Sequence, residues 1–211
     1  MQFKNLPNQD PFTKFEDYYL QAEANGQPIT EAGCISSVDV DGSPHARYVN
    51  FKYFFEDNLI FFSSYSSNKA NDFIANDNVA VNFWWAATNV QIRLEGQISK
   101  CPDIFSDEHF YGREQGKNIA AIASDQSQPI ESYEMLQAKF EQTKSLIESG
   151  ELEAKRPQDW AATKLKCLIL NSGKQVRKGS ITESVINYQV MIGRSFFFNP
   201  DSIVNRPTAL D

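Results

Sequence analysis

The chain has few of the residues from which metal centres and disulfide frameworks are built. Its 211 residues include two histidines, His45 and His109, and three cysteines, Cys34, Cys101 and Cys167. The cysteines are odd in number, far apart and without the paired spacing of metal ligands, which argues against a disulfide framework or a zinc site. Two histidines make a histidine-based metal centre hard to build. We therefore expect no metal site.

Other features are missing as well. The sequence has no nucleophile elbow and no glycine loop that could cradle a phosphate, which argues against a Ser–His–acid triad. The net charge is −7 and no continuous basic stripe occurs, so we expect no nucleic-acid partner. No apolar run is long enough to span a membrane, and no basic-then-apolar secretory leader is present at the N-terminus. We expect no membrane partner and a cytoplasmic location.

Aromatic residues, by contrast, are plentiful. The chain has 16 Phe, 8 Tyr and 3 Trp, and 41% of its residues are hydrophobic. Aromatic side chains favour broad, packed β surfaces and leave planar groups available for a flat ligand. The length allows one domain with a sizeable core.

The hydrophobic pattern predicts an α+β fold. An amphipathic helix is expected over residues 11–24, followed by an antiparallel meander of three strands over 32–40, 45–54 and 59–64. Further helices are expected over 66–76, 103–111 and 118–123 and from Ser132 to Ser149, with a loop over 112–116 between the second and the third. The inward residues are expected to be Ala70, Phe73 and Ile74 in the first of these helices, and Met135, Phe140 and Leu146 in the last. Strands are expected over 79–85, 90–99 and 165–171. Antiparallel strands in this order could close into a small barrel.

The stretch from Arg47 to Lys69 carries the clearest functional signal. Two apolar strands stand next to cations and lead into a Ser- and Asn-rich helix start. Lysine and arginine heads, together with the free N–H groups of a helix start, can hold phosphate. A plain β-hairpin with solvated cations is the alternative interpretation.

Several ordered motifs now indicate a family. They are Pro11-Phe12-Thr13-Lys14-Phe15, Gly42-x-Pro44-x-x-Arg47 followed by Lys52, Ser67-Asn68-Lys69-Ala70, Gln91 with Glu95-Gly96, Ala123-Ser124-Asp125-Gln126-Ser127, and Trp160. In this order and spacing, from about Pro11 to Leu170, the chain resembles the pyridoxamine 5'-phosphate oxidase family, flavoproteins of the FMN-binding split-barrel fold.

The resemblance implies an antiparallel split β-barrel with flanking helices, and a cytoplasmic enzyme of vitamin B6 metabolism. It implies FMN as cofactor, pyridoxamine or pyridoxine 5'-phosphate as substrate, pyridoxal 5'-phosphate as product and O2 as electron acceptor. It also implies a homodimer with FMN at the interface. The flavin would carry the redox step, so the protein would mainly position two rings and hold two phosphates.

Carried over position by position, the resemblance implies two sets of site residues. The cofactor-binding set is Arg47, Tyr48, Val49, Lys52, Phe62, Ser63, Lys69, Gln91, Gln126 and Ser127, the last two from the other subunit. The substrate-binding set is Lys52, His109, Arg113 and Lys117. Four positions depart from the family pattern: Phe62 and His109 replace tyrosines, Asn68 replaces an arginine and Lys117 replaces a serine.

One geometric difficulty arises within these sets. Arg47 and Lys52 are an odd number of residues apart, so a regular strand points their side chains to opposite faces. A bulge, a strand end or a dimer interface is needed for both to touch one ligand.

The C-terminal part departs from the family. The family continues with Trp-Gln and an Arg-x-His-x-Arg motif that grips substrate and FMN, but no Trp follows Trp160 and no His follows His109. If the codons for residues 171–176 and 179–183 are read one nucleotide earlier, the genetic code permits Glu-Phe-Trp-Gln-Ala-Gly and Arg-Leu-His-His-Arg. We therefore divide the chain into a split-barrel domain, 1–171, and an atypical segment, 172–211, which we expect to be out of the ancestral frame and poorly ordered. The catalytic residues stay unknown, and impaired activity is expected.

Two alternatives of other classes remain. The first is a non-catalytic split-barrel protein that binds flavin or another planar ligand, motivated by the departures at Asn68, His109 and Lys117. The second is a structural dimer with no cofactor.

Overall fold

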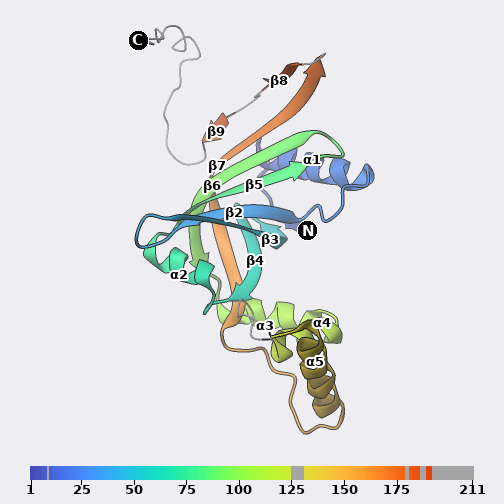
Figure 1. Ribbon diagram of the computed structural model, residues 1–211. Helices are drawn as coiled ribbons and strands as arrows, with labels where there is room; N and C mark the ends of the chain where they lie inside the picture. The colour runs from blue at the N-terminus through green and yellow to red at the C-terminus, as the bar shows by residue number, and fades with distance from the viewer. Residues whose placement is uncertain (9, 125–130, 179–180, 186–188, 192–211) are drawn as a thin grey trace.

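A computed structural model describes residues 1–8, 10–124, 131–178, 181–185 and 189–191. Six strands, each antiparallel to its neighbours, form a closed barrel in the order β3-β2-β5-β6-β7-β4, and pairing of β3 with β4 completes the ring (Figure 1). The strands are β2 (Ala32–Val38), β3 (Pro44–Phe55), β4 (Asn58–Ser64), β5 (Asn78–Trp85), β6 (Val90–Lys100) and β7 (Trp160–Lys178). The predicted α+β split barrel is confirmed.

Three short strands lie outside the ring. β1 (Gln2–Lys4) pairs in parallel with the end of β3, and β8 (Ile181–Val185) and β9 (Gln189–Met191) pair with β7. The sequence pattern did not predict them. The predicted strand over 165–171 is in fact the middle of the 19-residue β7. Whether a separate segment begins at residue 172, and in another reading frame, stays a prediction.

Five helices flank the barrel: α1 (Phe12–Ala24), α2 (Asn68–Ala75), α3 (Asp103–Gly112), α4 (Gln115–Ala123) and α5 (Tyr133–Glu148). In Figure 1, α3, α4 and α5 lie together beyond one end of the barrel, and α1 lies near the other end. No helix among the described residues is both long and apolar enough to cross a membrane.

The core is built from aromatic rings. Phe15 of α1 packs edge-on against Phe54, Phe83 and Trp85 at centroid distances of 5.0 to 5.6 Å, and all four side chains are buried. Edge-to-face pairs add to the stabilisation that burial alone gives such rings. The predicted aromatic packing of the β surfaces is thus confirmed and extends to α1.

A β-bulge lies in β3 at Lys52. Phe51 pairs with Phe61 and Tyr53 with Ile60, so β3 contains one residue more than β4 at this point. An extra residue shifts the alternation of side chains by one position. Phe51 and Phe54, three residues apart, are therefore both fully buried.

On the N-terminal side of the bulge, β3 no longer pairs with β4. The two strands pair only over Phe51–Phe55 of β3, whereas residues 44–50 pair with β2 on one side. Among the described residues no strand pairs with the other edge of this half of β3. The structure therefore leaves an open strand edge at the end of the barrel near α3.

Three details of the predicted helices were wrong. In α2, Ala70 is buried and Phe73 partly buried as predicted, but Ile74 is 78% exposed. Asp72 is buried as well, because it has ion-pair and hydrogen-bond partners on β2 and β3. In α5 no residue is buried and Met135 is exposed. α4 begins at Gln115, so that Gly116 and Lys117, expected before the helix, lie in its first turn.

Candidate functional site

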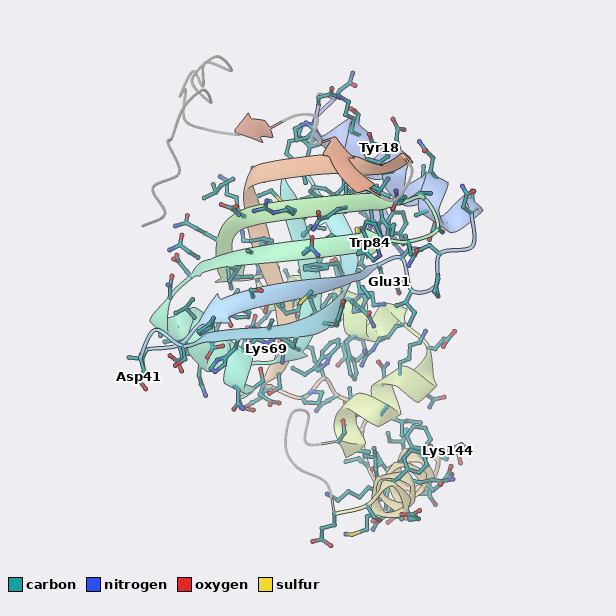
Figure 2. The ribbon with its side chains drawn as sticks, turned by 45° about the horizontal axis from the view of Figure 1, so that its top comes forward. Tyr18, Glu31, Asp41, Lys69, Trp84 and Lys144 are labelled. Carbon is teal, nitrogen blue, oxygen red and sulfur yellow. The ribbon has the colours of Figure 1, made fainter. Side chains whose placement is uncertain are left out.

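A cavity of about 470 Å³ lies along the open edge of β3. Its wall is formed by β3, the end of β4, the start of α2, the last turn of α3 and the start of β7. The lining residues are Arg47, Tyr48, Val49, Asn50, Lys52, Phe62, Ser63, Lys69, His109, Arg113 and Trp160. Figure 2 shows Lys69 at the end of the barrel that faces the helices α3 to α5.

The structure brings most of the residues expected from the sequence into this one cavity. Nine of them line it: Arg47, Tyr48, Val49, Lys52, Phe62, Ser63, Lys69, His109 and Arg113. The bulge at Lys52, together with the open edge, allows Arg47 and Lys52 to line the same cavity despite their odd spacing. Their roles in binding stay a prediction.

Four expected residues lie elsewhere. Gln91 does not line the cavity, and its amide donates a hydrogen bond of 2.9 Å to Asn82. Lys117 is exposed and pairs with Glu114 at 3.1 Å, so its side chain also lies outside the cavity. Gln126 and Ser127 lie outside the described residues.

One group of cavity cations, which we call the Lys69 pole, consists of Lys69 and Arg47. Burial, together with the nearby charge of Arg47, lowers the pKa of Lys69. Lys69 donates a hydrogen bond of 2.9 Å to Ser67, and among the described residues it has no carboxylate partner. The backbone N–H groups of Asn68 and Lys69, at the start of α2, have no acceptor within the described part of the chain. Such a helix start, with a lysine in it, can bind an anion.

The second group, which we call the Arg113 pole, consists of the cations Arg113 and Lys52 together with the neighbouring His109. The Arg113 guanidinium lies 4.2 Å from the centre of the Trp160 ring and is held by hydrogen bonds to Asn118 and to the backbone carbonyl of Lys117. It too has no carboxylate partner among the described residues. Lys52 is paired with Glu31 at 3.2 Å.

A stack of aromatic rings lines the same cavity. The Phe62 and His109 rings are nearly parallel, with centroids 3.8 Å apart, and Trp160 is stacked 5.1 Å from Phe62. The hydroxyl of Tyr53 and Nδ1 of His109 are 2.8 Å apart, a contact that the sequence did not predict. A cavity whose wall carries both cations and flat rings can hold a planar molecule with anionic groups.

The histidine in this stack is neutral at pH 7. Burial, followed by the charges of Arg113 and Lys52, lowers the pKa of His109 to about 4. Neutral imidazole can still donate or accept one hydrogen bond at each ring nitrogen. His109 therefore adds polarity to the cavity without adding charge.

Acid is expected to destabilise the protein through His109. The pKa is lower in the folded state than the usual 6.5, so the unfolded chain binds more protons between about pH 4 and 6.5. Stability should therefore fall as the pH drops through this window, by on the order of 1 to 2 kcal/mol after allowance for solvent screening. Thermal unfolding of the wild type and of His109→Phe, measured over this range, should show a smaller decrease in the variant. Equal decreases would contradict the assignment.

Comparison with known proteins gives a consistent result. The family model described as pyridoxamine 5'-phosphate oxidase matches residues 27–146. The pyridoxine/pyridoxamine 5'-phosphate oxidase 1 of Hydrogenovibrio crunogenus is 35% identical over 157 residues, which cover 74% of this chain and 71% of that protein. The corresponding oxidase of a Nostoc species is 33% identical over 156 residues, covering 74% and 72%.

Solved structures resemble the fold at lower identity. PhzG from Burkholderia lata, solved with tetrahydrophenazine-1-carboxylic acid, has a TM-score of 0.72 at 18% identity and covers 88% of this chain and 94% of its own. A pyridoxamine 5'-phosphate oxidase-related, FMN-binding protein from Nostoc punctiforme has a TM-score of 0.63 at 12% identity and covers 86% and 100%. With the family match over more than half of its length and these relatives in sequence and fold, the chain belongs to the pyridoxamine 5'-phosphate oxidase family.

Proposed function

We propose that the chain binds FMN and oxidises pyridoxamine or pyridoxine 5'-phosphate to pyridoxal 5'-phosphate, with O2 as acceptor. The observation that supports this most directly is the cavity with two cations, Lys69 and Arg113, that have no carboxylate partner among the described residues. Cofactor and substrate each carry one phosphate, and each pole offers one such cation. Family membership supports the same assignment.

The residues at the Lys69 pole fit the phosphate of FMN. Lys69 supplies a charge, the start of α2 supplies two N–H groups that have no acceptor in the described chain, and Ser63 supplies a buried hydroxyl on the cavity wall. Val49 and Phe62 offer apolar contact for a ring. These are the donors and surfaces that a flavin mononucleotide needs.

The Arg113 pole fits the phosphate of the substrate. Arg113 is fixed by Trp160, Asn118 and the backbone of α4, so its planar fork is held in place before a ligand binds. Preorganised donors lose little conformational entropy on binding. Lys52 stands at the same pole.

When bound, FMN would supply the hydride acceptor and would pass the electrons on to O2. The protein would hold the two rings in register and keep water from the reacting carbon. Neutral His109, hydrogen-bonded to Tyr53, would offer a hydrogen bond to the substrate at Nε2. We include in the proposal a cytoplasmic homodimer acting in vitamin B6 metabolism, with Gln126 and Ser127 reaching the FMN of the other subunit.

The direct test uses purified protein. FMN titration followed by flavin absorbance should show a bound flavin, and hydrogen peroxide should then form on addition of pyridoxamine 5'-phosphate. Because the C-terminal family motif is absent, we expect weak flavin retention and slow turnover. Flavin binding without peroxide would favour the alternative, a non-catalytic binding protein, which the replacements Asn68, His109 and Lys117 motivate. Sequencing the coding region for residues 168–183 would test the shifted reading frame.

Replacing Arg113 by alanine should raise the KM for pyridoxamine 5'-phosphate by about 10-fold or more, because a charge-assisted bond to phosphate contributes about 1.5 to 3 kcal/mol. The KM is measured from the steady-state rate of peroxide release. Lys117→Ala is the matched control, because it removes a nearby cation whose side chain lies outside the cavity. An equal effect of both variants would mean that Lys117 binds the substrate, as the sequence first suggested.

A further inference from the structure

Arg47, although it lines the cavity, already has partners for its guanidinium group. One terminal nitrogen donates to Ser37 Oγ at 2.6 Å, and the other donates to Asp72 Oδ2 at 3.0 Å. The first nitrogen is also 3.5 Å from the carbonyl oxygen of Ile35. A phosphate could gain Arg47 as a bidentate partner only by displacing these acceptors.

Asp72 is the strongest of these acceptors. Its side chain is 5% exposed, and its Oδ2 also accepts a hydrogen bond from Ser37 at 2.5 Å and lies 3.1 Å from His45 Nδ1. A buried carboxylate is costly unless it is paired. The charge of Arg47 compensates the charge of Asp72, and the pair as a whole is close to neutral.

The position of Asp72 connects this pair to the Lys69 pole. Asp72 lies three residues after Lys69 on α2, so one short helix carries both Lys69 and the acid that pairs with Arg47. Residues three apart on a helix lie on neighbouring parts of its surface. The acid is therefore built into the same element that forms the anion site.

We propose that Asp72 acts as an internal counter-ion that withholds Arg47 from the cavity, so that Lys69 and the start of α2 carry the recognition of phosphate at this pole. The inference rests on the proposed binding of FMN. It makes Asp72 a determinant of how strongly the site distinguishes a phosphorylated ligand from the same ring system without phosphate.

Riboflavin provides the comparison, because it has the ring of FMN without the phosphate. The quantity to measure is the ratio of the riboflavin and FMN dissociation constants, by quenching of flavin fluorescence. Asp72→Asn keeps the shape of the side chain and removes its charge, so Arg47 should become available and the ratio should rise about 5- to 10-fold.

Two further variants complete a double-mutant cycle on Arg47 and Asp72. Arg47→Gln leaves the charge of Asp72 beside the pole and should lower the ratio several-fold. The double variant, Arg47→Gln with Asp72→Asn, removes both charges and should return the ratio to near that of the wild type. A purely structural role of Asp72 would instead weaken FMN and riboflavin binding alike and leave the ratio unchanged.

Asp77→Asn is the matched control, because Asp77 follows the same helix but is exposed and has no ion pair within the described chain. It should leave the ratio unchanged. Ser37→Ala keeps both charges while loosening Arg47, and it should raise the ratio modestly if Asp72→Asn does not fold. An unchanged or lower ratio in folded Asp72→Asn, or in Ser37→Ala in its place, overturns the proposal.

The proposed function could fail independently. If no variant binds either flavin, FMN binding is refuted. The counter-ion proposal is then decided by titration with inorganic pyrophosphate, followed by tryptophan fluorescence, to which Trp160 in the cavity wall contributes. Tighter pyrophosphate binding by Asp72→Asn than by the wild type supports the proposal, and equal or weaker binding overturns it.

Discussion

Replacing Lys69 by alanine is expected to raise the dissociation constant for FMN by roughly 10- to 100-fold, because a hydrogen bond to a charged group contributes about 1.5 to 3 kcal/mol. Lys69 lines the cavity without a carboxylate partner in the described chain, and Arg47 is occupied by Asp72. Its ammonium group is partly desolvated, as the lowered pKa indicates, and a bound phosphate would restore the lost solvation. Flavin fluorescence titration measures the change.

Riboflavin binding should be unaffected by this substitution, since riboflavin has no phosphate for Lys69 to contact. Lys166→Ala, which removes an exposed lysine on β7, is the control and should bind FMN as the wild type does. Equal losses for FMN and riboflavin would indicate that Lys69 shapes the cavity and does not bind phosphate. An unchanged FMN constant would place the phosphate elsewhere.

Replacing Gly96 by alanine is expected to destabilise the barrel by about 3 kcal/mol or more, at the upper end of what overpacking costs. A Cβ atom at this position would lie 2.0 Å from the backbone oxygen of Lys166 on the adjacent strand. The register of β6 against β7 shifts between Glu95 and Gly96, so the two backbones approach closely here. Neither backbone can move without disturbing the ring of strands. Thermal unfolding should show a decrease in Tm of about 10 °C.

Gly116 provides the matched substitution. It lies in the first turn of α4, and a Cβ there would meet no atom within 4 Å. Gly116→Ala should therefore stabilise the protein, by roughly 0.5 to 1 kcal/mol, because alanine loses less entropy than glycine in a helix. If both variants had the same effect on Tm, the close approach at Gly96 would not be the cause.

The strands of the barrel could be predicted from the sequence because their signals are local. Alternating burial in β6, with Gln91, Arg93 and Glu95 on the outer face, follows directly from the residue pattern. A turn could be predicted as well: Gly42, with a φ of 83°, lies where the Asp41-Gly42 pair indicated a hairpin. The family's motif order then placed Lys52, Lys69 and Arg113 in one site.

The parts that could not be predicted depend on contacts between distant segments. Asp72 would be a surface residue of an isolated helix, and it is buried only because Arg47, His45 and Ser37 approach it from the sheet. The neutral state of His109 likewise depends on burial, to which the stacked Phe62 contributes, and on the charge of Lys52, both distant in the chain. Periodicity contains no information on such partners.

The open edge of β3 has a consequence for the solubility of the protein. A strand edge with unpaired N–H and C=O groups can pair with a strand from another molecule, which is a common route to aggregation. Here the edge borders a cavity lined by Arg47 and Lys69, and charged side chains of this kind discourage such pairing. A ligand lying in the cavity would shield the edge further. Occupancy of the cavity is therefore expected to reduce pairing of this edge with other molecules, in addition to any chemistry it serves.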